Sequence, residues 1–166
     1  FAPSSDMGGD APWQIIIDDN VPWLQIGWKD ENTYALASPP LVWDHWHHAV
    51  FVHDLPNQSM KIFLDGEQEV DVNISSDLGF NNLLGVNLTD NGTYTGLLSQ
   101  TAIWNNALTQ AEVMAVHEMG PDADLTTESD VYSSASSLYA YWKMDGSMDD
   151  NSGNGFNGTS NGWGAG

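Results

Sequence analysis

The stretch WDHWHHAVFVHD, residues 43–54, gathers four of the five histidines of the chain together with two aspartates. Imidazole and carboxylate groups bind transition metals and transfer protons, so this stretch is the first candidate for chemistry. Side chains alternate between the two faces of a β-strand, which places His47 and His53 on one face and His48 on the other, among apolar neighbours. His45 shares a face with His47, and no third ligand is specified. We therefore interpret the histidines as structural, with transition-metal binding as the alternative.

A second stretch with ligand chemistry is MDGSMDDNSGNG, residues 144–155. Calcium binds six to eight hard oxygen atoms from carboxylates, amide carbonyls and the backbone, and an acidic turn rich in glycine and asparagine can supply them. We predict a structural calcium ion here, with solvated turn acids as the alternative. The predicted metal ligands are Asp145, Asp149, Asp150, Asn151 and Asn154.

Aromatic residues stand beside aspartates in several predicted loops. An exposed ring can stack on the face of a pyranose while carboxylates bind its hydroxyl groups, so these loops are candidates for carbohydrate binding. Tryptophans of a β-sandwich are also common core anchors, which is the alternative for each of them. The predicted ligand-binding residues are Trp13, Trp23, Trp28, Asp30, Asp90 and Tyr94.

Short β-strands are expected to position these residues. Between residues 13 and 104, apolar and aromatic runs recur at the spacing of roughly 8–12 residues that is typical of a β-sandwich. Asp65 and Gly66, between two alternating runs, predict a tight hairpin. The fold class is therefore all-β. The predicted strands are 13–18, 21–28, 33–38, 46–53, 60–66, 69–74, 82–86, 94–104 and 138–145.

One short helix is expected near residues 109–119. Thr109 and Glu112 have the spacing of a capping box, and a Gly-Pro pair then ends the apolar pattern. Residues 121–137 are polar and poor in large apolar groups, so they predict a linker or a long loop.

The charge of the chain is strongly negative. Its 166 residues include 23 aspartates and glutamates against three lysines and no arginine, a formal net charge of −20 at pH 7. Such a surface repels phosphate groups, which argues against nucleic acid and anionic membranes as partners. No apolar run reaches the roughly 18 residues of a membrane span, so no membrane insertion is expected. The acidity suits a saline extracellular environment, where salt screens self-repulsion.

Three stretches resemble the laminin G-like, concanavalin A-like lectin/glucanase jelly-roll domains of bacterial surface and secreted proteins. They are WHHAVFVHD followed by MKIFLDGE, then YTGLLSQTAIWNNALTQAEVMAV, then LYAYWKMDGSMDDNSGNGFNGT. The resemblance implies a two-sheet antiparallel jelly-roll sandwich. It also implies a structural calcium ion between the last of these loops and an Asp-Glu pair on the last long strand, where this chain has Ser99 and Gln100.

The order of these stretches differs from that in a single copy of the family. Residues 1–120 resemble a jelly roll without its usual first strands, residues 121–137 are the linker or long loop, and residues 138–166 resemble the opening strand and loop. Three explanations are open: an excerpt from two tandem domains, a circular permutation, or a subunit whose last strand completes a neighbouring copy. A lone strand would be an exposed edge, so a partner for it is expected.

These observations predict a non-catalytic extracellular module that binds carbohydrate or mediates adhesion, with glycans or surface polysaccharide as partners. The first alternative is a structural subunit of a surface filament or large adhesin, assembled from neighbouring copies by exchange of the C-terminal strand. The second is a glycoside hydrolase, whose retaining form needs two carboxylates about 5–5.5 Å apart. The Glu-x-Asp-x-x-Glu strand of the glucanase relatives does not occur, and Glu67 and Glu69 flank the hairpin turn. No enzymatic activity is therefore expected.

Overall fold

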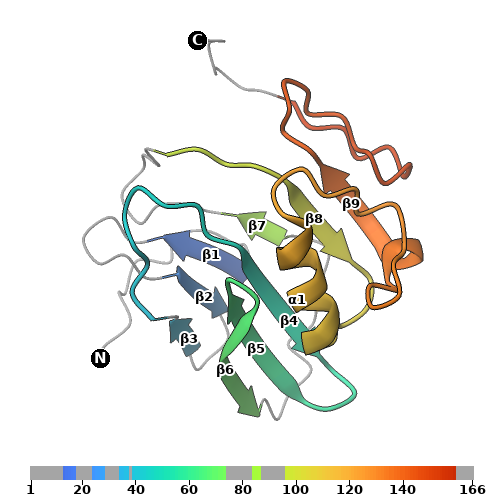
Figure 1. Cartoon of the computed structure of the whole chain (residues 1–166). Coiled ribbons are helices and arrows are strands. Elements are labelled where there is room, and N and C mark those ends of the chain that lie inside the picture. Colours follow the sequence, from blue (N-terminus) through green and yellow to red (C-terminus); the bar gives the residue numbers. More distant parts are fainter. Residues whose placement is uncertain are drawn as a thin grey trace. The chain divides into compact units, whose positions relative to one another are not determined.

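The computed structural model describes residues 39–73 and 96–159 with their side chains, and the strands at 13–17, 24–28, 34–37 and 84–86 by their backbone. Contacts divide the chain into two compact units, Phe1–Thr95 and Gly96–Gly166 (Figure 1). This division differs from the predicted boundaries at residues 120 and 138. The physical reason is that strands on either side of residues 121–137 pair with each other.

The first sheet of the N-terminal unit contains β1 (Trp13–Ile17), β2 (Leu24–Trp28), β3 (Tyr34–Ala37) and β7 (Leu84–Val86). Its strand order is β3-β2-β1-β7. The pairs β1–β2 and β2–β3 are antiparallel, as predicted. Strand β7 pairs with β1 in parallel, which the prediction of an antiparallel sandwich did not include.

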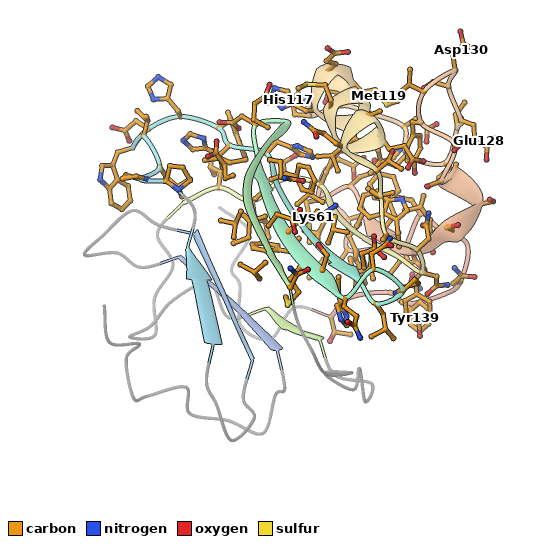
Figure 2. The ribbon with its side chains drawn as sticks, turned by 90° about the horizontal axis from the view of Figure 1, so that it is seen from below. Lys61, His117, Met119, Glu128, Asp130 and Tyr139 are labelled. Carbon is orange, nitrogen blue, oxygen red and sulfur yellow. The ribbon has the colours of Figure 1, made fainter. Side chains whose placement is uncertain are left out.

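The second sheet contains β4 (Ala49–Asp54), β5 (Ser59–Leu64) and β6 (Glu67–Asn73), in that order and antiparallel throughout. The central strand β5 supplies Met60, Ile62 and Phe63, each 1% exposed or less. On the same strand the ammonium of Lys61 lies 3.9 Å from a carboxylate oxygen of Asp71 on β6 (Figure 2). The all-β class is thus confirmed, with a core on the middle strand of this sheet.

The C-terminal unit contains β8 (Thr101–Trp104), α1 (Gln110–Met119), the 3-10 helix η1 (Ala135–Ser137) and β9 (Leu138–Trp142). The predicted helix is confirmed, and Thr109 is its N-cap in a complete capping box with Glu112. No helix in the described part of the chain has the length and apolar character to cross a membrane.

The segment 121–137, predicted as a linker or long loop, is a loop packed into the core of the C-terminal unit. Two buried tyrosines bind its backbone. The hydroxyl of Tyr132 donates to the carbonyl of Leu125 over 3.0 Å, and that of Tyr141 donates to the carbonyl of Ala123 over 2.7 Å. Both loop residues are buried as well, so the loop holds β9 in place.

Strand β9 is covered along both edges by its own chain. One edge pairs with β8 in antiparallel register. Along the other edge, the Asn154 side-chain amide donates to the carbonyls of Leu138 and Tyr139 over 3.1 and 3.0 Å, and the Asn151 amide donates to the Tyr141 carbonyl over 2.6 Å. The strand that was predicted to need a partner therefore finds it within the chain.

Candidate functional site

The loop at residues 42–47, ahead of β4, exposes two tryptophans. Trp43 is 58% exposed and Trp46 is 61% exposed. The strand predicted at 46–53 begins at Ala49 instead, so Trp46 lies in the loop and not in the framework. We call residues 42–47 the tryptophan loop.

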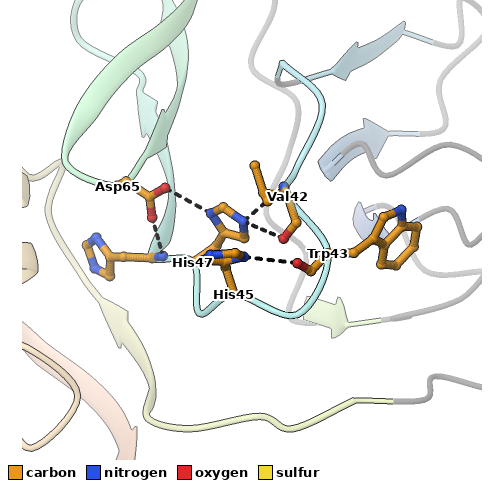
Figure 3. A network of polar contacts seen from close by, with 6 residues as sticks. Val42, Trp43, His45, His47 and Asp65 are labelled. Carbon is orange, nitrogen blue, oxygen red and sulfur yellow. Dashed lines mark hydrogen bonds and ion pairs between the residues drawn. The ribbon is translucent and has the colours of Figure 1, made fainter.

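The tryptophan loop is fixed to the hairpin turn between β5 and β6 through a single aspartate (Figure 3). The Nδ1 atom of His47 lies 2.8 Å from Oδ2 of Asp65, and the backbone amide of His48 donates to Oδ1 of Asp65 over 2.8 Å. The Asp65 amide in turn donates to the His48 carbonyl over 2.7 Å. Asp65 and Gly66 have φ of 52° and 87°, the left-handed conformation of a tight hairpin turn, which confirms the predicted hairpin.

The other ring nitrogen of His47 contacts Val42, the first residue of the tryptophan loop. A carboxylate can only accept, so Nδ1 carries the proton in the contact with Asp65. The Nε2 atom lies 3.1 Å from both the amide nitrogen and the carbonyl oxygen of Val42, so it accepts from the amide when the ring is neutral and donates to the carbonyl when the ring is protonated. His47 therefore links the β5–β6 turn to the tryptophan loop, and we call its contacts with Asp65 and Val42 the clamp. Among the described residues, no three His, Cys, Asp or Glu side chains form a group that could hold a metal.

Two polar residues stand between the two tryptophans in the sequence. Asp44 and His45 are exposed, and Asp44 has a left-handed backbone with φ of 61°. Nδ1 of His45 lies 2.9 Å from the carbonyl oxygen of Trp43, which holds the imidazole close to the backbone of the loop. The loop thus combines aromatic faces with hydrogen-bonding groups.

The residues predicted to bind carbohydrate are placed only in part. Trp13 and Trp28 are register partners on β1 and β2, and their side chains lie outside the described residues. The remaining four predicted residues also lie outside the described part of the chain: Trp23, Asp30, Asp90 and Tyr94. Trp43 and Trp46 were not among the predicted binding residues. Trp46 was assigned to the predicted strand 46–53, and Trp43 was considered only as part of the histidine-rich stretch.

Among the predicted calcium ligands, Asp150 has a different role. Its Oδ1 accepts from the amides of Tyr141 and Ser152, and its Oδ2 accepts from the Ser152 hydroxyl and the Phe156 amide, all over 2.9 to 3.0 Å. Two oxygens offer about four lone-pair sites, so all four are occupied. Burial raises the pKa of the Asp150 carboxyl, but these hydrogen bonds outweigh it and hold the pKa well below its usual value. Asp150 therefore does not fit a calcium ligand.

The other predicted ligands are spread over the same loop. Asn154 and Asn151 cover the edge of β9, and Asp149 is exposed, with its amide bonded to the Ser147 hydroxyl over 2.9 Å. Asp145 is exposed and lines a pocket of the C-terminal unit. These five residues therefore do not form one coordination sphere, and the calcium ion stays a prediction.

The pocket that Asp145 lines has a volume of about 340 Å³ and lies within the C-terminal unit. Its lining is mostly polar and combines groups of both charges with an amide and a hydroxyl. The lining residues are Ser99, Gln100, Pro121, Asp122, Lys143, Met144 and Asp145. Ser99 and Gln100 immediately precede β8, so the pocket lies where the family resemblance placed a metal.

A family model agrees with the strand architecture. Residues 3–114 match the model of the family described as the concanavalin A-like lectin/glucanases superfamily. A solved structure that is similar is an S-layer domain-containing protein (residues 221-444) from Clostridium thermocellum ATCC 27405, with 15% identity and a TM-score of 0.40. That match covers 58% of this chain and 52% of the other, so the chain spans about half the length of that structure. No curated protein matches the sequence.

Proposed function

Because the chain belongs to the concanavalin A-like lectin/glucanases superfamily and is a jelly-roll sandwich, we propose that it is a non-catalytic extracellular module that binds carbohydrate through its tryptophan loop. The observation that carries the proposal is the exposure of Trp43 and Trp46 on a loop that His47 and Asp65 hold in one conformation.

The chemistry of the loop suits a sugar. A pyranose presents an apolar face of C–H groups and a rim of hydroxyl groups. An indole ring covers the apolar face, while the exposed side chains of Asp44 and His45, which stand between the two tryptophans in the sequence, can bind hydroxyl groups. Because the clamp fixes the loop before binding, little conformational entropy is lost when the ligand docks.

An extracellular location is part of the same proposal. The net charge of −20 favours a saline surrounding and disfavours nucleic acid, and surface polysaccharide is a neutral or hydroxyl-rich partner that such a chain can approach. Adhesion is the use we propose for the binding. Assembly by exchange of the C-terminal strand is not proposed, because β9 is covered on both edges by its own chain.

The proposal excludes hydrolysis. Glu67 and Glu69, the closely spaced glutamates considered above, are exposed on β6 beside the hairpin turn. Release of reducing sugar from a panel of polysaccharides would reveal an enzyme. We expect no release above that of a heat-inactivated sample, and release that disappears in the Glu67→Gln variant would overturn the non-catalytic assignment.

The test of binding is a glycan array followed by titration of the best ligand against variants. Trp43→Ala and Trp46→Ala should each weaken binding about tenfold or more, because covering one aromatic side chain is worth roughly 1.5–3 kcal/mol. The matched control is Tyr139→Ala, an exposed aromatic of the C-terminal unit that is 42% exposed. Unchanged affinity in both tryptophan variants, with loss in the tyrosine variant, would move the site to the other unit.

A further inference from the structure

Asp65 binds two neighbouring residues of the segment ahead of β4. Its Oδ2 lies 2.8 Å from Nδ1 of His47, and its Oδ1 accepts from the backbone amide of His48 over 2.8 Å. The side chain of His47 is only 19% exposed, so its contact with Asp65 lies largely out of water. A polar atom that loses its partner in such a place is poorly compensated by solvent, which makes the loss costly.

The second ring nitrogen of His47 meets both a donor and an acceptor of one residue (Figure 3). Its Nε2 atom lies 3.1 Å from the amide nitrogen of Val42 and 3.1 Å from the carbonyl oxygen of the same residue. A neutral ring with its proton on Nδ1 accepts from the Val42 amide, whereas a protonated ring donates to the Val42 carbonyl. The ring therefore has a hydrogen bond on each nitrogen in both protonation states.

The charges around the clamp decide how it responds to pH. The imidazole of a histidine changes its charge between about pH 5 and pH 8, whereas an aspartate carboxylate stays ionised over that range. In the part of the chain that the structure describes, Asp65 is the one titratable side chain that forms a hydrogen bond or ion pair with His47. Other titratable residues stand close by along the chain: Asp44, His45, His48, Glu67 and Glu69.

We propose that Asp65 is a positioning residue of the tryptophan loop, and that it makes the geometry of this loop independent of the charge on His47. The proposal rests on the proposed function, since the loop is the candidate binding site, and it adds how that site responds to pH. As the pH falls, Nε2 exchanges the Val42 amide for the Val42 carbonyl, and Asp65 keeps both of its hydrogen bonds. The exposed rings of Trp43 and Trp46 therefore stay in place.

The variant Asp65→Asn keeps the shape of this side chain and removes its charge. Asparagine tolerates the left-handed backbone at this position, where φ is 52°, so the hairpin turn is kept. The amide oxygen can accept from the His48 amide while the NH₂ group donates to Nδ1 of a neutral His47 ring. A protonated ring has no lone pair on Nδ1. One of the two contacts is then lost, whichever way the amide turns.

The binding experiment titrates the neutral oligosaccharide that binds best on the glycan array, at constant ionic strength between pH 8 and pH 5. The native affinity should stay constant within about a factor of two, because each ring nitrogen keeps a hydrogen bond. The affinity of Asp65→Asn should fall about three- to tenfold as the pH falls, because one hydrogen bond is lost. Adding His47→Gln to that variant should abolish the fall. The control His45→Ala removes the other imidazole of the loop and should leave the native profile flat.

A second measurement needs no sugar, so it separates failure of this proposal from failure of the proposed function. NMR spectra over the same pH range, recorded in the His45→Ala background, follow the Val42 amide, the His47 ring and the indoles of Trp43 and Trp46. The Val42 amide should shift as His47 titrates, because it loses its acceptor, while both indole signals keep their positions. In Asp65→Asn the indole signals should shift or broaden over the same range.

Three results overturn the proposal. The first is a pair of indole signals that moves in the native loop as His47 titrates, and the second is a pH profile of Asp65→Asn as flat as the native one. The third is a Val42 amide that does not follow the titration of His47, and this result decides the question if Asp65→Asn does not fold. If no sugar binds at any pH, the proposed function fails, and the NMR spectra alone decide whether Asp65 positions the loop.

Discussion

The tryptophan loop at 42–47 and the acidic loop at 144–156 are both held in place by polar side chains that bind backbone groups. In the first, the polar side chains of His47 and Asp65 turn inward to hold backbone groups, and two apolar rings are left exposed. In the second, Asp150 turns inward to hold three backbone amides and a hydroxyl.

The comparison shows that imidazole and carboxylate side chains, which the sequence marks as candidates for metal binding or catalysis, form hydrogen bonds with backbone groups of the two loops instead. A backbone amide near the core must be paired, and a short acidic or imidazole side chain is the nearest acceptor. The side chains that remain available to a ligand are then those whose residue types give the weakest indication of function in the sequence. In this chain the residues that we propose for ligand binding are Trp43 and Trp46.

Loss of the acidic anchor should give the largest effect on stability. Asp150→Ala removes the acceptor of four hydrogen bonds, three of them from backbone amides. Hydrogen bonds to a charged group are worth roughly 1.5–3 kcal/mol each, and partial exposure reduces the sum, so we expect a loss of about 4 kcal/mol. Urea unfolding measures it, and hydrogen exchange should show faster exchange at the Tyr141 and Phe156 amides. Exchange as slow as in the native chain would contradict the anchoring role.

Glu112, a buried carboxylate, tests whether an acidic side chain acts in the same way elsewhere in this unit. Burial raises its pKa, but hydrogen bonds from Ser134, Thr109 and Ser133 outweigh burial and lower the pKa from 4.5 to about 2. A pKa that is lower in the folded state stabilises the fold above the unfolded value of 4.5. This contribution, about 3 kcal/mol, is lost as the pH falls from about 4.5 to about 2.

The measurement for Glu112 is the free energy of unfolding in urea between pH 7 and pH 2. The native chain should lose stability through that window, and Glu112→Gln should be less stable at pH 7 and show a flatter profile. Identical slopes in the two proteins would show that other carboxylates carry the acid sensitivity.

His47 allows the corresponding test of a polar anchor in the N-terminal unit. His47→Ala removes the contacts with Asp65 and with the Val42 amide, so we expect a loss of about 1–2 kcal/mol in the free energy of unfolding and weaker sugar binding. His45→Ala, which removes one contact of an exposed ring, is the control and should cost about 0.5 kcal/mol or less. Full binding by the His47 variant would show that the loop needs no clamp.

The sequence predicts those features that local patterns determine. The hairpin at Asp65 and Gly66 and the capping box at Thr109 depend on neighbours within a few residues, and both are confirmed. The features that sequence reasoning missed depend on distant partners. Asp150 finds the amide of Tyr141 nine residues upstream, and a carboxylate that binds calcium has the same local pattern as one that binds amides.

The start of β4 shows the same limit at the candidate site. Alternating residues from 46 onward fit a strand, yet β4 begins at Ala49, and His47, just ahead of it, contacts Asp65 eighteen residues away. Tryptophan in a β-sandwich is more often buried than exposed, so composition favoured a core position for Trp46. The exposure of Trp46 therefore does not follow from local sequence patterns and becomes apparent only with tertiary contacts such as that of His47 with Asp65.

The smallest expected effect on stability separates ligand-binding tryptophans from structural ones. Trp43→Ala and Trp46→Ala should change the free energy of unfolding by about 0.5 kcal/mol or less, since most of each side chain already contacts water. Trp104→Ala is the matched control, because its ring packs against the core of the C-terminal unit and its indole nitrogen donates to the Tyr132 hydroxyl over 2.9 Å. It should cost about 3 kcal/mol. If the Trp43 and Trp46 variants lose as much free energy of unfolding as the Trp104 variant, Trp43 and Trp46 are structural residues, and the proposal that they bind a ligand fails.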